Sequence, residues 1–281
     1  MLSGPRAAVL GTPITHSLSP VLHQAAYDAL GLTNWVFERH ELGVTQLAQF
    51  LGGLDDQWRG LALTMPLKER ALELCGRASD LAMGTGAANT LIHKGGSWDA
   101  DNTDVWGVRA ALLEAGVVAG TGGVAVLLGS GATARSALAA CSALGIDEVV
   151  FGVRDQVRPE TMQQAAHAGL RTSAVPLADV ASVLADAAVT ISTLPPGGAD
   201  SVADALLLGG RSGAGVLLDV VYAGWPTPLA AAAAHAGLTV VPGIEMLIHQ
   251  AAEQVRLMTG LTAPLTAMQV AGRAAHAAQA S

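Results

Sequence analysis

Short apolar runs alternate with helical stretches along the whole chain. The apolar runs end at glycine, proline or polar residues, as buried strands do, and the stretches between them carry apolar side chains at helical spacing. The predicted strands are 7–10, 35–40, 60–65, 88–93, 98–100, 124–128, 148–153, 189–193 and 216–221. The predicted helices are a first one that is capped by Ser19, carries Pro20 at its first position and ends at Gly31, and then 44–51, 67–75, 104–114, 132–144, 159–167, 244–259 and 264–279. This alternation predicts an α/β fold.

The rhythm of the pattern changes at residues 116–123, which are rich in glycine and small side chains, as domain boundaries often are. Beyond this segment, strands and helices follow one another regularly, which is typical of parallel βαβ units. We therefore predict two domains. Residues 1–104 with 244–281 form an N-terminal α/β substrate domain to which the C-terminal helices return, and residues 105–243 form a Rossmann dinucleotide-binding domain.

Composition and charge exclude several classes of protein. Hydrophobic residues make up 51% of the 281 residues and charged residues 14%, against about 25% in an average protein, so the chain is not disordered. A net charge of −8 argues against a nucleic-acid partner, which requires a basic face. Glycine or proline interrupts the uncharged stretches, and the first 17 residues lack the apolar centre of a secretion signal, so we expect no membrane span. The two cysteines predict reduced thiols in a cytoplasmic protein.

The segment 129–134 has the form G-x-G-x-x-A and lies between a predicted strand and a predicted helix. In dinucleotide-binding folds, the first glycine makes a tight turn, the second lets the backbone approach a pyrophosphate, and the third small residue lets helix and strand pack closely. We expect Gly129, Ser130, Gly131 and Ala132 to contact the cofactor. The alternative is a tight turn with no ligand.

The end of the second strand of this unit distinguishes NADP from NAD. An arginine there pairs with the 2′-phosphate of NADP, whereas an acidic residue binds the ribose hydroxyl of NAD. This chain has Arg154 at that position, followed by Asp155, with Arg158 four residues after Arg154. The arrangement favours NADP and leaves NAD possible.

Ser17 and Ser19 lie two residues apart in front of the first predicted helix. In extended backbone, such residues face the same side, so both hydroxyls can meet one ligand at a helix N-terminus, where a carboxylate is favoured. The alternative is that Ser19 only caps the helix and Ser17 is an ordinary loop residue, and the local sequence fits both interpretations equally well.

Lys68 is one of only two lysines in the chain, and it lies just past the end of a predicted strand among apolar neighbours. Strand ends in α/β sheets face ligand crevices, where a lysine can take part in proton transfer. The alternative, which usually applies to a single lysine, is a first-turn helix residue that points to water. Lys94, in contrast, lies at a hairpin turn. Asp104 opens a predicted helix, where helix capping is its common use. Asn89 enters a strand, where asparagine is disfavoured unless it serves a ligand.

Other catalytic signatures do not occur. The eight histidines include no H-E-x-x-H pair, the cysteines have no metal-ligand spacing, and there is no G-x-S-x-G nucleophile elbow. We therefore predict no metal.

Seven segments of the chain, in their order along it, resemble motifs of the shikimate dehydrogenase family. They are 11–20, Thr64-Met65-Pro66-Leu67-Lys68, 88–90, 101–104, 129–134, Tyr222 with 226–229, and 243–252. The resemblance extends over nearly the whole chain. It implies the reversible, NADPH-dependent reduction of 3-dehydroshikimate to shikimate, a step toward chorismate and the aromatic amino acids. It also implies a small-molecule partner and either a monomer or a homodimer.

The resemblance implies a role for each matching residue. It makes Lys68 and Asp104 the catalytic pair at the reacting hydroxyl. It assigns the substrate carboxylate to Ser17 and Ser19, and the ring hydroxyls to Thr64, Asn89 and Gln250. It places Arg154 at the 2′-phosphate, and the nicotinamide side is implied to be lined by Thr193, Tyr222, Gly243 and Met246.

The chain departs from the family pattern at two places. Ala62 stands two residues before the motif threonine, where the family often has asparagine and sometimes serine, so one hydrogen bond to a substrate hydroxyl is expected to be missing, at a cost of about 1 kcal/mol. Residues 152–155 keep the arginine but not the rest of the common Asn-Arg-Thr sequence. Two alternatives stay open, namely an NAD-dependent quinate/shikimate dehydrogenase and a non-catalytic sensor of NADP or of a cyclic acid.

Overall fold

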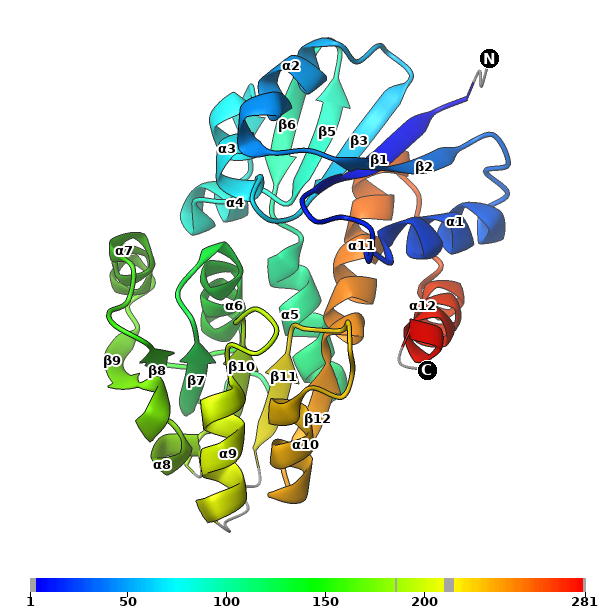
Figure 1. The fold of residues 1–281 in the computed structure, drawn as a ribbon. Helices are drawn as coiled ribbons and strands as arrows, with labels where there is room; N and C mark the ends of the chain where they lie inside the picture. Colours follow the sequence, from blue (N-terminus) through cyan, green and yellow to red (C-terminus); the bar gives the residue numbers. More distant parts are fainter. Residues whose placement is uncertain (1–3, 185, 210–214, 280–281) are drawn as a thin grey trace. The chain divides into compact units, whose positions relative to one another are not determined.

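The computed structural model describes residues 4–184, 186–209 and 215–279. The chain divides into two compact units, Met1–Trp106 with Leu247–Ala278, and Gly107–Met246 with Gln279–Ser281. Each unit has its own sheet with helices packed on it (Figure 1). The predicted α/β class, with two domains, is confirmed.

The first unit is built on a mixed sheet of six strands in the order β2-β1-β3-β5-β6-β4. Its strands are β1 (Arg6–Gly11), β2 (Val36–Glu41), β3 (Trp58–Leu63), β4 (Arg77–Ala78), β5 (Thr90–Lys94) and β6 (Ser97–Asp101). β1 pairs in parallel with β2 and β3, whereas β5 runs antiparallel to both β3 and β6. The helices of its N-terminal segment are α1 (Ser19–Ala29), α2 (Leu47–Gly52), α3 (Lys68–Leu74) and α4 (Asp80–Thr85), with a 3-10 turn at Val44–Gln46.

Both faces of this sheet are buried, which explains why its central strands are continuous apolar runs. Along β1, Ala8 and Leu10 pack with side chains of α2, α3 and α4. Ala7 and Val9, which alternate with them, pack with Tyr27 of α1 and with Met258 of a C-terminal helix. The two-residue period of a strand thus divides one apolar run between two cores.

The second unit has a fully parallel sheet of six strands in the order β12-β11-β10-β7-β8-β9. Its strands are β7 (Val124–Leu128), β8 (Glu148–Val153), β9 (Arg171–Pro176), β10 (Val189–Ser192), β11 (Val216–Asp219) and β12 (Thr239–Pro242). Counted within the unit and from the other edge, this order is 3-2-1-4-5-6, the strand order of the Rossmann fold. The predicted Rossmann architecture is confirmed.

Helices connect the strands of the second unit. They are α6 (Ala132–Ala143), α7 (Pro159–His167), α8 (Ala181–Leu184), α9 (Asp200–Gly209) and α10 (Pro228–His235), with a 3-10 turn at Leu177–Asp179. Two further helices, α5 (Asp104–Glu114) and α11 (Gly243–Thr259), each begin in one unit and end in the other, and α12 (Leu265–Gln279) follows them.

The start of α1 differs from the prediction. The helix begins at Ser19 itself, and Leu18, whose side chain cannot form a cap hydrogen bond, occupies the capping position. Instead, the Ser19 N–H donates to Oγ of Ser17 at 3.3 Å, so Ser17 satisfies the first free N–H of the helix. The predicted helix 44–51 is also divided into the 3-10 turn and α2.

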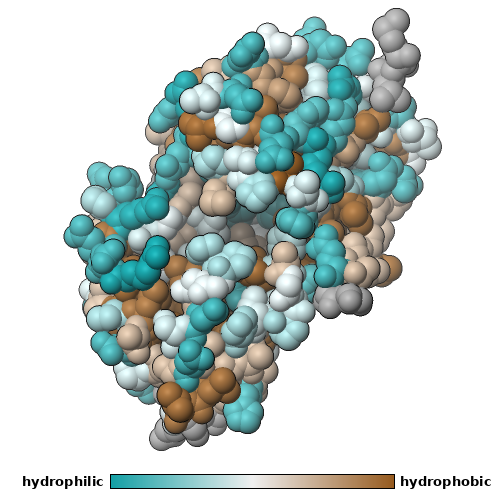
Figure 2. Space-filling model, viewed as in Figure 1, coloured by the Kyte–Doolittle hydropathy of each residue, from teal (hydrophilic) through white to brown (hydrophobic). Residues whose placement is uncertain are grey.

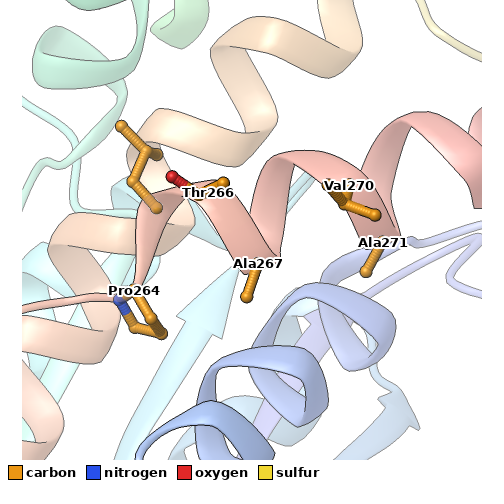
Figure 3. A pocket seen from close by; sticks show the side chains of 6 residues that line it. Pro264, Thr266, Ala267, Val270 and Ala271 are labelled. Carbon is orange, nitrogen blue, oxygen red and sulfur yellow. The ribbon is translucent and has the colours of Figure 1, made fainter.

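No helix among the described residues is long and apolar enough to cross a membrane. Figure 2 shows hydrophilic and hydrophobic side chains interspersed over one face. A pocket of about 710 Å³ lies along α12 and is lined by six residues (Figure 3). These are Pro264, Leu265, Thr266, Ala267, Val270 and Ala271, and none of them is a predicted site residue.

Candidate active site

An ion pair joins the first residues of two helices in the first unit. Lys68 begins α3 and Asp104 begins α5, and Lys68 Nζ lies 2.5 Å from Asp104 Oδ2. The side chains are only 13% and 7% exposed, so water screens this pair far less than a surface pair. A carboxylate in the first turn is favourable because of the helix dipole, so the position of Asp104 follows from its sequence context.

Asn89 holds the second oxygen of the same carboxylate. Its Nδ2 donates to Asp104 Oδ1 at 2.8 Å and to Gln250 Oε1 at 3.1 Å. Its Oδ1 accepts the backbone N–H of Thr103 at 2.8 Å. With Lys68 on one oxygen and Asn89 on the other, the Asp104 carboxylate is fixed in position and orientation. The structure thus brings together four of the predicted site residues.

Ala62 lies on β3, the strand that leads to Lys68, and Thr64 follows the last residue of that strand. The N–H of Thr64, just past the end of β3, donates to the carbonyl of Leu10 at 2.9 Å. The end of β1 passes close by, because a Cβ added to Gly11 would overlap Cγ2 of Thr64. Ala62 is buried, pairs with Thr90 across the sheet and packs in the core beneath α1.

Ser17 and Ser19 are both buried at the N-terminus of α1. An Arg39 guanidinium N–H donates to the carbonyl of Ser17 at 2.8 Å, and Nδ1 of His23 lies 2.9 Å from the carbonyl of Ser19. These contacts fix the two serines from both sides, at a helix end that favours an anion.

The glycine loop of the second unit connects β7 to α6. Gly129 follows β7 with φ +98, and a Cβ there would meet Thr193 Oγ1 at 2.8 Å. The Thr193 hydroxyl donates to the carbonyl of Leu128 at 2.8 Å, so this threonine cannot move away easily. Gly131 caps α6, and a Cβ there would meet no atom within 4 Å, which leaves space for a ligand to approach. Only glycine suits the first position, whereas the second is open.

The segment after β8 lies against this loop. The Arg158 N–H donates to Oγ of Ser130 at 3.3 Å, and the Thr161 hydroxyl donates to the Ser130 carbonyl at 2.8 Å. Arg154 and Asp155 follow the last residue of β8 directly, and both are exposed. The sequence favoured NADP through Arg154 and left NAD possible through Asp155, and the structure leaves both side chains exposed next to β8.

The remaining predicted cofactor residues surround the ends of β11 and β12. Half-buried Tyr222 follows β11, while Gly243 and Met246 lie buried in the first turn of α11. A Cβ at Gly243 would meet the carbonyl oxygen of Asp219 at 2.9 Å and would overlap that of Val220. Glycine is required here because two chain segments approach closely.

Sequence reasoning missed four buried polar residues of these sites, His23, Thr90, Asp219 and Gln254. Thr227 Oγ1 donates to Asp219 Oδ2 at 2.7 Å and thus fixes the segment that carries Tyr222, and burial raises the pKa of Asp219. Gln254 lies four residues after Gln250, and this helical spacing is a signal that could have revealed it. The described residues contain no group of three or more histidine, cysteine, aspartate or glutamate side chains that could hold a metal.

Two family models match the chain. The model of the shikimate dehydrogenase substrate binding domain matches residues 9–91, and that of the shikimate 5'-dehydrogenase C-terminal domain matches residues 243–269. A shikimate dehydrogenase (NADP(+)) of Dinoroseobacter shibae is 33% identical over 265 residues, which cover 93% of this chain and 94% of that protein. The chain belongs to the shikimate dehydrogenase family. The resemblance seen in the sequence motifs is thereby confirmed.

Solved shikimate dehydrogenase structures share the fold. The structure of the enzyme from Mycobacterium tuberculosis is 40% identical and covers 96% of this chain and 99% of its own, with a TM-score of 0.85. The Thermus thermophilus enzyme, solved in complex with NADP(H) and shikimate, is 31% identical with a TM-score of 0.80 and covers 96% of this chain and 99% of its own. In the pentafunctional AROM polypeptide of Candida tropicalis, which is 32% identical, the match covers 91% of this chain but only 17% of that protein.

Proposed function

We propose that this chain catalyses the reversible, NADPH-dependent reduction of 3-dehydroshikimate to shikimate, in the pathway to chorismate and the aromatic amino acids. The observation that carries the proposal is the buried Lys68–Asp104 pair, with Asn89 on the second carboxylate oxygen. A Rossmann unit with a glycine loop stands in the same chain. The membership of the family supports the same activity.

The chemistry of the pair suits a carbonyl that becomes an alcohol. NADPH, when bound, supplies the hydride. Lys68 Nζ and the Asp104 carboxylate lie within hydrogen-bond distance of each other, so a proton on either group can be passed to the oxygen of the substrate. The ammonium group also stabilises negative charge that develops on that oxygen, in a site with little water.

The substrate is a small carboxylic acid with ring hydroxyls, and the first unit offers groups for each part. Ser17 and Ser19 at the N-terminus of α1 hold the carboxylate. Thr64, Asn89 and Gln250 bind the hydroxyls. Ala62 offers no polar group, so one hydroxyl is bound less tightly than in relatives that have asparagine or serine there.

The cofactor is held by the second unit, whose residues fit it. Gly129, Ser130, Gly131 and Ala132 cradle the pyrophosphate at the N-terminus of α6. Arg154 binds the 2′-phosphate through its planar guanidinium. Thr193, Tyr222, Gly243 and Met246 line the nicotinamide side. The subunit number and the cytoplasmic location stay predictions.

One observation supports a second candidate function, which is NAD-dependent oxidation of quinate or shikimate. Asp155 is as exposed as Arg154 and follows it directly, so NAD can be bound through its ribose hydroxyl. In that case, the same catalytic pair oxidises quinate or shikimate with NAD. A sensor without catalysis is disfavoured, since binding alone does not require the buried pair of Lys68 and Asp104.

The test is a turnover assay that follows the absorbance of the reduced cofactor. Shikimate and quinate are each offered with NADP and with NAD. Turnover of shikimate with NADP alone is the expected result. A preference for NAD or quinate would establish the second function and point to Asp155. No turnover with any pairing would contradict an enzymatic role and favour the sensor.

A further inference from the structure

Gln254 lies on α11, one helical turn beyond Gln250, and is hydrogen-bonded to the residue pair Asn89 and Thr90 next to Asp104. Its side chain is buried, with 1% of the residue exposed. Its Nε2 donates to the Asn89 carbonyl at 3.3 Å and to Oγ1 of Thr90 at 3.0 Å. One amide group thus binds both the backbone of Asn89 and the side chain of the following residue.

The hydrogen of the Thr90 hydroxyl is directed by this contact. The amide nitrogen of Gln254 can only donate, so the Thr90 hydroxyl must give its own hydrogen elsewhere. Its donor bond to Asn89 Oδ1 is 2.8 Å long, shorter than its 3.3 Å contact with the Thr103 hydroxyl. Asn89 Oδ1 is therefore kept as an acceptor, and Nδ2 at the other end of the amide is turned toward Asp104 Oδ1, where it donates at 2.8 Å.

A second group supports the same orientation. The backbone N–H of Thr103 also donates to Asn89 Oδ1, at 2.8 Å. Asn89 Oδ1 thus accepts from Thr103, through both its N–H and its hydroxyl, and from the Thr90 hydroxyl, which depends on α11. Loss of the α11 contact loosens the asparagine without reversing it.

The other end of the Gln254 amide shows which end matters. Its Oε1 is buried and has no hydrogen-bond partner among the described residues. An unsatisfied buried carbonyl has a free-energy cost, which an apolar side chain of similar size would avoid. Keeping an amide there is consistent with a need for its donor end.

We propose that Gln254 is a positioning residue that acts through Thr90 and Asn89 on the carboxylate of Asp104. The inference rests on the proposed catalytic role of Asp104. It adds to the site a buried glutamine of α11 that reaches Asp104 only through Thr90 and Asn89. It predicts that loss of the Gln254 amide slows the chemical step while cofactor binding stays intact.

The kinetic test uses Gln254→Met, which keeps the volume and removes the donor, Thr90→Val, which keeps the shape and removes the hydroxyl, and the double variant. We expect each single variant to lower kcat for shikimate about tenfold, with KM for NADP unchanged. The loss stays below the roughly 100-fold that a 1 Å misplacement causes, because Thr103 still holds Asn89. The double variant is expected to lose no more kcat than the single variant with the larger loss, since both changes interrupt one path.

Gln164→Met is the matched control in the other unit. That glutamine also donates from Nε2 to a backbone carbonyl, of Arg135 at 2.9 Å, and its Oε1 is also buried without a partner. A general effect of losing a buried glutamine would lower kcat in both variants. We expect kcat to change less than twofold in Gln164→Met.

A spectroscopic measurement separates this inference from the proposed function. The side-chain amide signal of Asn89 in a ¹H–¹⁵N spectrum, assigned with Asn89→Asp, is expected to shift in Gln254→Met and stay in place in Gln164→Met. If the wild type does not oxidise shikimate, the proposed function fails, but this spectrum still shows whether Gln254 orients Asn89. Any of three results would overturn the inference. The Asn89 signal could stay in place in Gln254→Met, kcat of Gln254→Met could stay within twofold of wild type, or the two losses could multiply in the double variant.

Discussion

Lys68 and Asp104 form a buried pair whose members are separated by 36 positions in the sequence. We expect Lys68→Ala and Asp104→Ala each to lower kcat by about 10²–10⁴, the range for loss of a general acid or base. Steady-state turnover of shikimate measures this loss, and circular dichroism checks the fold. Lys94→Ala is the control, because Lys94 is the only other lysine and is exposed at the end of β5. A near-normal rate in either alanine variant would exclude that residue from the chemistry.

Arg154 is the residue proposed to bind the 2′-phosphate of NADP. Arg154→Ala is expected to raise KM for NADP by roughly 10- to 100-fold, because a charge-assisted bond to phosphate contributes about 1.5–3 kcal/mol. KM for NAD should change little, since NAD lacks the 2′-phosphate. Arg171→Ala, on an edge strand of the same sheet, removes an exposed arginine that pairs with Asp147 and Glu148 instead. Equal effects on NADP and NAD in Arg154→Ala would contradict the assignment.

His23 makes stability depend on pH. Burial lowers its pKa from 6.5 to about 4, against the opposing effect of its hydrogen bond to Ser19. Between these two values, the unfolded chain binds a proton that the folded chain does not, so stability falls as pH decreases from 6.5 to 4, by the order of 3 kcal/mol. Urea unfolding across this range should show a shallower dependence for His23→Gln. The exposed His235→Gln should keep the wild-type slope, and equal slopes in wild type and His23→Gln would contradict the prediction.

Local sequence predicted residues whose type is unusual for their position, but not those that become polar contacts only in the fold. Lys68 stood out because lysine is rare in this chain, and Asn89 because asparagine is disfavoured in strands. His23 and Gln254 lie within amphipathic helices, where a histidine or glutamine attracts no notice. Their partners Ser19 and Thr90 are fixed by helix geometry and sheet pairing that no local pattern displays.

At the scale of elements, the central buried strands and the edge strand β2 were predicted, whereas the edge strands β4, β9 and β12 were missed. β7, β8 and β10 are central and almost fully buried, so each is a continuous apolar run. β9 is an edge strand with mostly exposed or half-buried residues, so it carries no such run. α4 and α10 were also missed, although their caps Ser79 and Thr227 accept the N–H of Ala82 and Ala230, both at 3.1 Å.

The end of β1 offers a test of how elements position the site. In Gly11→Ala, the new Cβ would overlap Cγ2 of Thr64 and meet the Met65 carbonyl at 2.9 Å. We expect a loss of about 1–3 kcal/mol in unfolding free energy, as for overpacked cores, together with a higher KM for shikimate because Thr64 is displaced. Thermal unfolding and steady-state kinetics measure the two effects.

Gly84→Ala in α4 is the control for this substitution. A Cβ there would meet no atom within 4 Å, so the change should be neutral or stabilise the helix by about 0.5–1 kcal/mol. If Gly11→Ala behaved like Gly84→Ala, the close approach of β1 to the Thr64 segment would not constrain the site.

At the scale of the whole molecule, the change in the strand and helix pattern at residues 116–123 separates the strands of the first sheet from those of the second. The chain passes between its compact units at 106/107 and at 246/247, inside α5 and α11, whereas the sequence placed the crossings at 104/105 and 243/244. Helices that continue across such a point give no turn signal, so their pattern of apolar residues does not show where one core ends. The assignment of substrate and cofactor to the two units stays a prediction.

Hydrogen exchange with one ligand at a time tests that assignment. A ligand stabilises the segments that hold it, by about 2.7 kcal/mol at a concentration of 100 times its Kd. NADP alone is expected to slow amide exchange at 129–134 and 154–158, and shikimate alone at 17–19, 64–68 and 101–104. In Arg154→Ala, protection by NADP should weaken while protection by shikimate persists. Shikimate that slowed exchange at 129–134 without any cofactor would show that the acid binds the Rossmann unit, and the proposed roles of Ser17 and Ser19 would fall with it.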